Sequence, residues 1–163
     1  METVAVYFEK PVRTYGLKLQ EGKVALSLEC GAERLAGLTA ALAAVDPPLR
    51  LLSCSLMWED DQALLYFCLP EEMAPLLEKT ATRAGARLAQ RQAAGVINLQ
   101  GPHFGDRWGL VSEALGGLQD AQVEPLSLLG VTHTLQVTVS SKDGQAALEG
   151  LGQGFCAPGG HND

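Results

Sequence analysis

Positive charge is scarce in this sequence and nowhere clustered. The 163 residues include 12 Lys and Arg against 19 Asp and Glu, which gives a formal net charge of -7 at pH 7. Surfaces that bind nucleic acid rely on clustered Lys and Arg, and the basic residues here form no run. We therefore expect no nucleic acid among the partners of this chain.

Long apolar runs are also missing. No run approaches the ~18 residues that a transmembrane helix needs. The first residues, Met1–Val4, lack the basic region and the apolar core of a signal peptide. We therefore expect no membrane association and a cytoplasmic location.

Cysteine is present but not in a chemically suggestive pattern. None of Cys30, Cys54, Cys68 and Cys156 belongs to a C-x-x-C pair, and none has a histidine at metal-ligand spacing. We interpret all four as buried, reduced thiols that behave as small hydrophobic groups. A disulfide or a zinc site is the less favoured alternative.

Catalytic constellations are equally lacking. Ser53, Ser55 and Ser127 have no His and Asp partners in a recognisable arrangement. Loops of a sheet could bring His103 and His133 to one end, but no carboxylate or cysteine has matching spacing. We therefore expect no metal, no cofactor and no enzymatic activity, and a small enzyme is the weakest of the functional hypotheses.

The sequence is rich in apolar residues arranged in two periods. Hydrophobic residues make up 47% of the chain and charged residues 19%, which is enough to form a core. Apolar spacing predicts helices at 33–45, from 71 to a terminating glycine at 85, at 107–118 and at 145–151. Alternation and β-branched residues predict strands at 3–8, 14–19, 24–28, 49–57, 62–69, 86–90, 96–99, 123–128 and 134–139.

The pattern repeats with a shift of 72 residues. Val24 aligns with Val96, and the strand that ends at Phe67 aligns with the one that ends at Val139. Each copy reads strand, loop, helix, strand, strand, helix, which is the order of a ferredoxin-like βαββαβ unit with helices on one face of an antiparallel sheet. The fold class predicted is therefore α+β.

The closing strand differs between the copies. The first copy has one at 86–90, whereas the second ends in a helix and a glycine-rich tail, 156–163, which we expect to be flexible. An empty strand position would leave backbone groups unpaired. We therefore predict that the strand at 14–19 completes the second unit and intertwines the two.

These elements resemble the regulatory region of aspartokinases, a tandem of ACT domains. The likeness lies in the strand at 14–17, the turn and strand that follow it, the segment 95–99 and the strand pair between 123 and 139. The resemblance implies a first ACT unit at 20–91 and a second at 92–155 completed by strand 14–19. The segment 1–13, with its extra N-terminal strand, and the tail at 156–163 lie outside these units.

The segment Gly101–Leu110 is the candidate site. A loop between a strand and a helix can direct backbone N–H groups and a helix N-terminus at a small anion. ACT domains bind amino acids at side-by-side domain interfaces, and the corresponding loop often reads Asp-Arg-Pro-Gly. The resemblance implies ligand contacts at Gly105, Asp106, Arg107, Trp108 and Gly109, with Thr132 as a further hydroxyl, and weaker candidates at Arg34 and Gly37 of the first copy.

A structural interpretation of this loop stays open. Asp106 can serve as a helix N-cap, and Gly109 can be needed for close packing. The aromatic residues Phe104 and Trp108 can cover a ligand or pack between domains.

Two functions of different classes remain. The first is a non-catalytic regulatory protein that binds a small amino acid and transmits occupancy through domain or subunit packing. The second is a structural or partner-binding module without a small-molecule ligand. We expect a homodimer in either case, and a client enzyme as a further partner.

Overall fold

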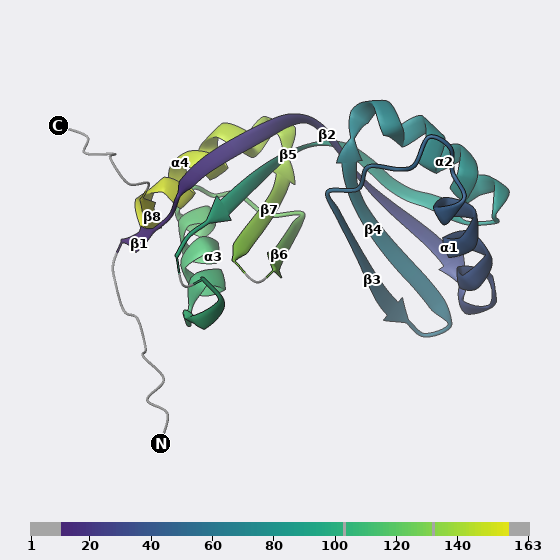
Figure 1. Ribbon diagram of the computed structural model, residues 1–163, viewed down its shortest axis with the longest axis horizontal. Helices are drawn as coiled ribbons and strands as arrows, with labels where there is room; N and C mark the ends of the chain where they lie inside the picture. Colours follow the sequence, from purple (N-terminus) through teal and green to yellow (C-terminus); the bar gives the residue numbers. More distant parts are fainter. Residues whose placement is uncertain (1–10, 103, 132, 157–163) are drawn as a thin grey trace, which may run out of the picture. The chain divides into compact units, whose positions relative to one another are not determined.

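The chain forms two compact units, which we name by their position in the sequence (Figure 1). The computed structural model describes residues 11–102, 104–131 and 133–156. The central unit comprises residues 22–94, and the terminal unit comprises residues 1–21 together with 95–163. Each unit has its own hydrophobic core.

The fold is α+β, with antiparallel strand pairs and four α-helices in the described residues. Strands follow the order β3-β4-β2-β5-β7-β6, and β1 and β8 form a separate parallel pair. The pairs β2–β4, β3–β4 and β6–β7 are antiparallel. The strands are β1 (Val12–Arg13), β2 (Gly16–Gly31), β3 (Ser53–Glu59), β4 (Gln62–Pro70), β5 (Arg87–Gln100), β6 (Ser127–Val131), β7 (Thr134–Ser140) and β8 (Phe155–Cys156).

Each α-helix is preceded by a single 3-10 turn. In the central unit, η1 (Ala32–Arg34) precedes α1 (Leu35–Ala43), and η2 (Glu71–Met73) precedes α2 (Ala74–Arg83). In the terminal unit, η3 (Phe104–Asp106) precedes α3 (Leu110–Asp120), and η4 (Ser141–Asp143) precedes α4 (Gly144–Gly154). The predicted order of helices and strands is therefore present in both copies.

Alternation along the strands builds the two cores. In the central unit, Leu26 of β2 pairs with Phe67 of β4, and both point into the core with Leu38 of α1 and Leu77 of α2. In the terminal unit, alternate residues of β5 and β7 face α3 and α4 in the same way. The buried residues of this core include Ile97, Leu99, Leu118, Leu135, Val137, Val139 and Leu151.

Helix termini follow the local sequence. Gly85 has a φ of 82° and ends α2, as predicted. Its N–H donates to the carbonyl of Thr82, and the N–H of Ala86 donates to that of Ala81, which satisfies the last carbonyls of the helix. Gln122 takes the same left-handed place after α3, with a φ of 56°.

The two helices of the terminal unit pack against each other through glycine. A Cβ atom on Gly117 of α3 would lie 2.6 Å from the carbonyl oxygen of Gly150 on α4. Side chains larger than hydrogen at these positions would therefore push the two helices apart.

Two pairs of predicted strands are each one strand. The strands predicted at 14–19 and 24–28 belong to β2, and those predicted at 86–90 and 96–99 belong to β5. Polar residues and glycine between them suggested turns. Gly22, with a φ of 68°, instead lies where β2 passes from the terminal unit to the central one.

Other boundaries shift by a few residues. The third helix begins at Leu110 rather than at 107, and the strand predicted at 123–128 is β6, Ser127–Val131. Cys156, predicted to lie in the tail, belongs to β8. The strand predicted at 3–8 and the tail after Cys156 lie outside the described residues.

Candidate functional site

The loop between β5 and α3 is the candidate site of the terminal unit. Its residues run from Gly101 to Gly109, and we call it the second loop because it belongs to the second copy. Gly105, Trp108 and Gly109 are exposed, Trp108 to 78%, whereas Arg107 is half-buried. The predicted contact residues Gly105–Gly109 form one continuous stretch of this loop, and Asp106 is the last residue of η3. Thr132 lies outside the described residues.

Phe104 fixes the start of the second loop. Its ring is buried, with 6% of the residue exposed, in the core of the terminal unit. It stands 6.4 Å from the ring of Phe155, centroid to centroid. Phe104 therefore packs within its own unit, whereas the sequence suggested that it would cover a ligand or pack between domains.

α3 begins at a left-handed glycine. Gly109 is the N-cap residue, with a φ of 84°, and as a glycine it has no side chain that could cap the first turn. Asp106 was a predicted N-cap, but the cap falls three residues later. Free N–H groups and the helix dipole give such an N-terminus a partial positive charge, so it can accept a carboxylate.

The loop between β2 and α1, which we call the first loop, is built differently. It consists of η1, which runs directly into α1, and the N–H of Leu35 donates to the carbonyl of Ala32. By the 72-residue shift, α1 would correspond to a helix that begins at 107, yet α3 begins at 110. In the second loop, Arg107–Gly109 therefore lie between the 3-10 turn and the helix, whereas their counterparts at 35–37 are already helical.

The two weaker candidates lie in this first loop and its helix. Arg34 donates from Nη1 to the carbonyl oxygen of Gly85 at 3.2 Å, just beyond the end of α2. Its Nε also lies 3.4 Å from Oε1 of Glu33. Gly37 lies inside α1, with open space where a Cβ would stand. The positive charge of Arg34 thus lies at the C-terminus of α2, where the helix dipole favours a cation.

Polar side chains accompany the second loop at the strand ends. Gln100, the last residue of β5, donates from Nε2 to Oγ1 of Thr134 at 3.2 Å. The carbonyl of Gln100 accepts the N–H of Tyr15, whose side chain is 68% exposed. Sequence reasoning missed these three residues, because the pairing that brings them together joins distant segments.

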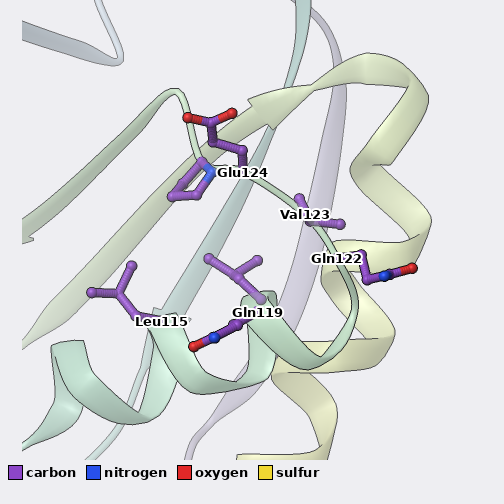
Figure 2. Close-up of a pocket in the computed structure, with 7 residues that line it drawn as sticks. Leu115, Gln119, Gln122, Val123 and Glu124 are labelled. Atoms are coloured by element: carbon purple, nitrogen blue, oxygen red, sulfur yellow. The ribbon is translucent and has the colours of Figure 1, made fainter.

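An exposed apolar face of α3 was also missed. Val111 and Leu115 are one helical turn apart and are exposed to 46% and 44%. An open groove of about 420 Å³ continues from Leu115 past the end of the helix (Figure 2). Helical periodicity could have revealed this face, because α3 has more apolar positions than one buried stripe uses. The groove is lined by Leu115, Leu118, Gln119, Gln122, Val123, Glu124 and Pro125.

The thiols are reduced in the described chain, but one prediction about them is wrong. Cys30 and Cys68 are buried, as predicted, whereas Cys156 is only half-buried. Cys54 is exposed, because it lies on the edge strand β3. Burial, reinforced by the carboxylate of Glu33 and opposed by Arg34, raises the pKa of Cys30.

Neither a metal site nor a membrane span is found in the part of the chain that the structure describes. No group of three or more His, Cys, Asp or Glu side chains there could hold a metal ion. None of the described helices combines the length and the apolar character that crossing a membrane requires.

Known structures share this α+β architecture. The regulatory subunit of aspartate kinase from Thermus thermophilus, in its ligand-free form, superposes with a TM-score of 0.76 at 12% identity, covering 90% of this chain and 100% of that one. The regulatory subunit from Thermus flavus gives a TM-score of 0.73 at 11% identity, with coverages of 86% and 97%.

A putative C-terminal regulatory domain of aspartate kinase from Porphyromonas gingivalis W83 is also similar. Its TM-score is 0.59 at 12% identity, covering 85% of this chain and 95% of that one. No protein-family model matches the sequence, and no curated protein matches it. This chain therefore resembles the regulatory subunits of aspartate kinase in its fold, over most of its length.

Proposed function

We propose that this protein is a non-catalytic, ACT-type regulatory protein that binds a small amino acid at the second loop. One observation carries the proposal: α3 begins at a left-handed glycine, Gly109, which has no side chain to cap the first turn and follows the exposed Trp108. The ligand carboxylate accepts bonds from the backbone N–H groups of that turn. Asp106, an acid in the same loop, pairs with the ligand ammonium.

Each unit of the fold is, on this proposal, an ACT unit. In the central unit the strand order β3-β4-β2-β5 fits a βαββαβ motif, and in the terminal unit the order β2-β5-β7-β6 fits the same motif. The N-terminal part of β2 then supplies the closing strand of the second unit. Ligand occupancy acts by favouring one packing arrangement over another, through a difference in affinity for the two.

We further propose that two copies pair along β3. This strand stands at one end of the strand order, and its residues Leu56, Met57 and Trp58 are exposed to 44%, 56% and 55%. An antiparallel pair with a twofold axis near residue 55 sets each Arg50 beside the acidic turn at 59–61 of the other copy. Neutral apolar residues and opposite charges favour such pairing in a chain of net charge -7.

Light scattering of the eluting peak tests the β3 dimer. Trp58→Lys should convert a dimer into a monomer, because two lysines would face the apolar edge. Trp108→Lys is the matched control: it changes the other exposed tryptophan, away from the edge, and should leave the mass unchanged. A Trp58→Lys variant that keeps the dimer mass overturns this interface.

A partner-binding module is the second candidate function. The exposed face of α3 at Val111 and Leu115, with the groove beyond it, favours this function. Such a face suits a client protein more than a small polar ligand. If this chain bound an amino acid and also regulated a client enzyme, both candidate functions would hold together.

A thermal-shift screen with the twenty amino acids tests ligand binding. A ligand at a hundredfold excess over its dissociation constant should raise the melting temperature by roughly 5–10 °C. The Asp106→Ala variant should lose this shift, whereas Arg34→Ala should keep it. The absence of a shift for every amino acid at millimolar concentration would reject the ligand and leave the partner-binding module.

A further inference from the structure

The two ends of the described chain meet beside the second loop. Val12 and Arg13 of β1 pair in parallel with Phe155 and Cys156 of β8. Val12 and Phe155 are buried, with 4% and 1% of each residue exposed. A two-residue strand pair is weak by itself, so its side chains and flanking bonds must hold it.

Thr14 supplies the flanking bonds. Its N–H and its hydroxyl both donate to the carbonyl oxygen of Cys156, at 2.7 and 3.1 Å, and the residue is fully buried. The next N–H, of Tyr15, donates to the carbonyl oxygen of Gln100 at 2.6 Å. The segment from β1 onward is thus bonded both to β8 and to the residue just before the second loop.

The second loop is anchored on this same cluster. The Phe104 ring packs against Phe155 and shares a core with Val12. A Cβ atom on Gly101 would lie 2.6 Å from the carbonyl oxygen of Arg13 and would also meet the Phe104 ring. The backbone at Gly101 therefore passes closely between β1 and Phe104, which requires glycine.

We infer that the β1–β8 pair holds the second loop in its conformation, with Phe155 and Thr14 as positioning residues that act through Phe104. Phe104 immediately precedes Gly105–Gly109, so movement of its ring displaces them. Opening of the β1–β8 pair separates Phe155 from Phe104. The loop then loses the fixed point that precedes Gly105. The loop is fixed at its other end by α3, where the N–H of Glu113 donates to Gly109.

Coupling between the loop and the terminal pair is reciprocal. This consequence rests on the proposed function, in which the second loop binds an amino acid. The ligand must then stabilise the β1–β8 pair by the same free energy that the pair contributes to ligand binding. Ligand binding would then strengthen the pairing of β1 with β8, and a partner in contact with either strand would sense that change.

Time-resolved fluorescence anisotropy of Trp108 tests the inference without any ligand. A Trp58→Phe background leaves Trp108, in the second loop, as the single tryptophan. In that background, Phe155→Leu and Thr14→Val each weaken the terminal pair, and Phe155→Tyr keeps the ring. Phe67→Leu is the matched control, because Phe67 is buried in the core of the central unit.

At a temperature at which every variant is folded, Phe155→Leu and Thr14→Val should increase the fast local motion of Trp108. Amide exchange at 105–109 should become about two- to tenfold faster. Phe155→Tyr should restore the parental values, and Phe67→Leu should lower stability without changing either reading. Unchanged Trp108 motion in folded Phe155→Leu and Thr14→Val would overturn the inference.

A ligand experiment separates this inference from the proposed function. If an amino acid binds, it should slow amide exchange at Thr14, and Phe155→Leu should weaken its affinity by the same two- to tenfold factor. If no amino acid binds, the proposed function fails, while the anisotropy result still decides whether the terminal pair holds the loop.

Discussion

The first and second loops occupy equivalent places in the repeat, but they are built differently. The first loop is helical up to α1, whereas the second contains non-helical residues before α3. In the first loop, η1 continues into α1, and Arg34 bonds to the end of α2. In the second loop, three residues separate η3 from α3, and the helix begins at a left-handed glycine. The difference teaches that a repeated pattern preserves packing more readily than it preserves a binding loop.

The anchors of the two loops differ as well. Phe104 is buried in the second loop, whereas the residue 72 positions earlier, Ala32, is exposed. The second loop can therefore project residues into solvent from a fixed point. The first loop needs no such anchor, because its backbone remains helical.

The largest expected effect tests this anchor. Phe104→Ala should lower the free energy of unfolding by about 3–5 kcal/mol, the usual cost of removing a buried aromatic ring. Ala32→Ser, in the first loop, should change it by less than ~0.5 kcal/mol, as exposed substitutions do. Urea denaturation of both variants measures the contrast. Similar losses in the two would show that the loops are anchored alike.

A second contrast concerns glycine in the helices. Gly150→Ala should lower stability by about 1–3 kcal/mol, because the added methyl group would press on α3 at Gly117. Gly37→Ala, in the exposed part of α1, should instead raise stability by roughly 0.5–1 kcal/mol. Thermal unfolding followed by circular dichroism provides both values. A stabilising Gly150→Ala would refute the close helix crossing.

The left-handed start of α3 makes a third, smaller prediction. Gly109→Ala should lower the free energy of unfolding by about 1–2 kcal/mol, because the residue adopts a φ of 84°. Gly109→Asn should have a smaller effect, because asparagine tolerates this conformation. If the alanine and asparagine variants unfold alike, and both like the parent, the loop does not need this conformation.

The smallest effect is expected for Arg34. Its side chain is 58% exposed, so Arg34→Ala should reduce the free energy of unfolding by ~1 kcal/mol or less. Raising the ionic strength should shrink the difference further, since its pairing with Glu33 is screened by salt. A salt-independent loss well above this size would mean that Arg34 has a role beyond these contacts.

Much of the fold was predictable from periodicity, and the errors have physical causes. The order of strands and helices follows from apolar spacing, and Gly85 marked the end of α2. The merged strands β2 and β5 were not predictable, because polar residues and glycine at 20–23 suit a turn as well as a passage between units. Cys54 looked buried because its exposure depends on β3 being an edge strand.

The candidate site was less predictable than the fold. The resemblance to aspartokinase regulatory regions indicated Gly105–Gly109, and these residues form one continuous stretch of the second loop. The anchoring of Phe104 by Phe155, and the proximity of Tyr15, Gln100 and Thr134, depend on contacts between segments that are far apart in the sequence. Local patterns carry no information about such contacts.

Amide exchange measured residue by residue during an amino-acid titration tests the central claim most directly. A binding amino acid should slow exchange at 105–112, where the second loop meets α3, and should leave 32–38, in the first loop and the start of α1, unchanged. Protection confined to 32–38, or no protection in either loop with any of the twenty amino acids, would contradict the assignment of the ligand site to the second loop.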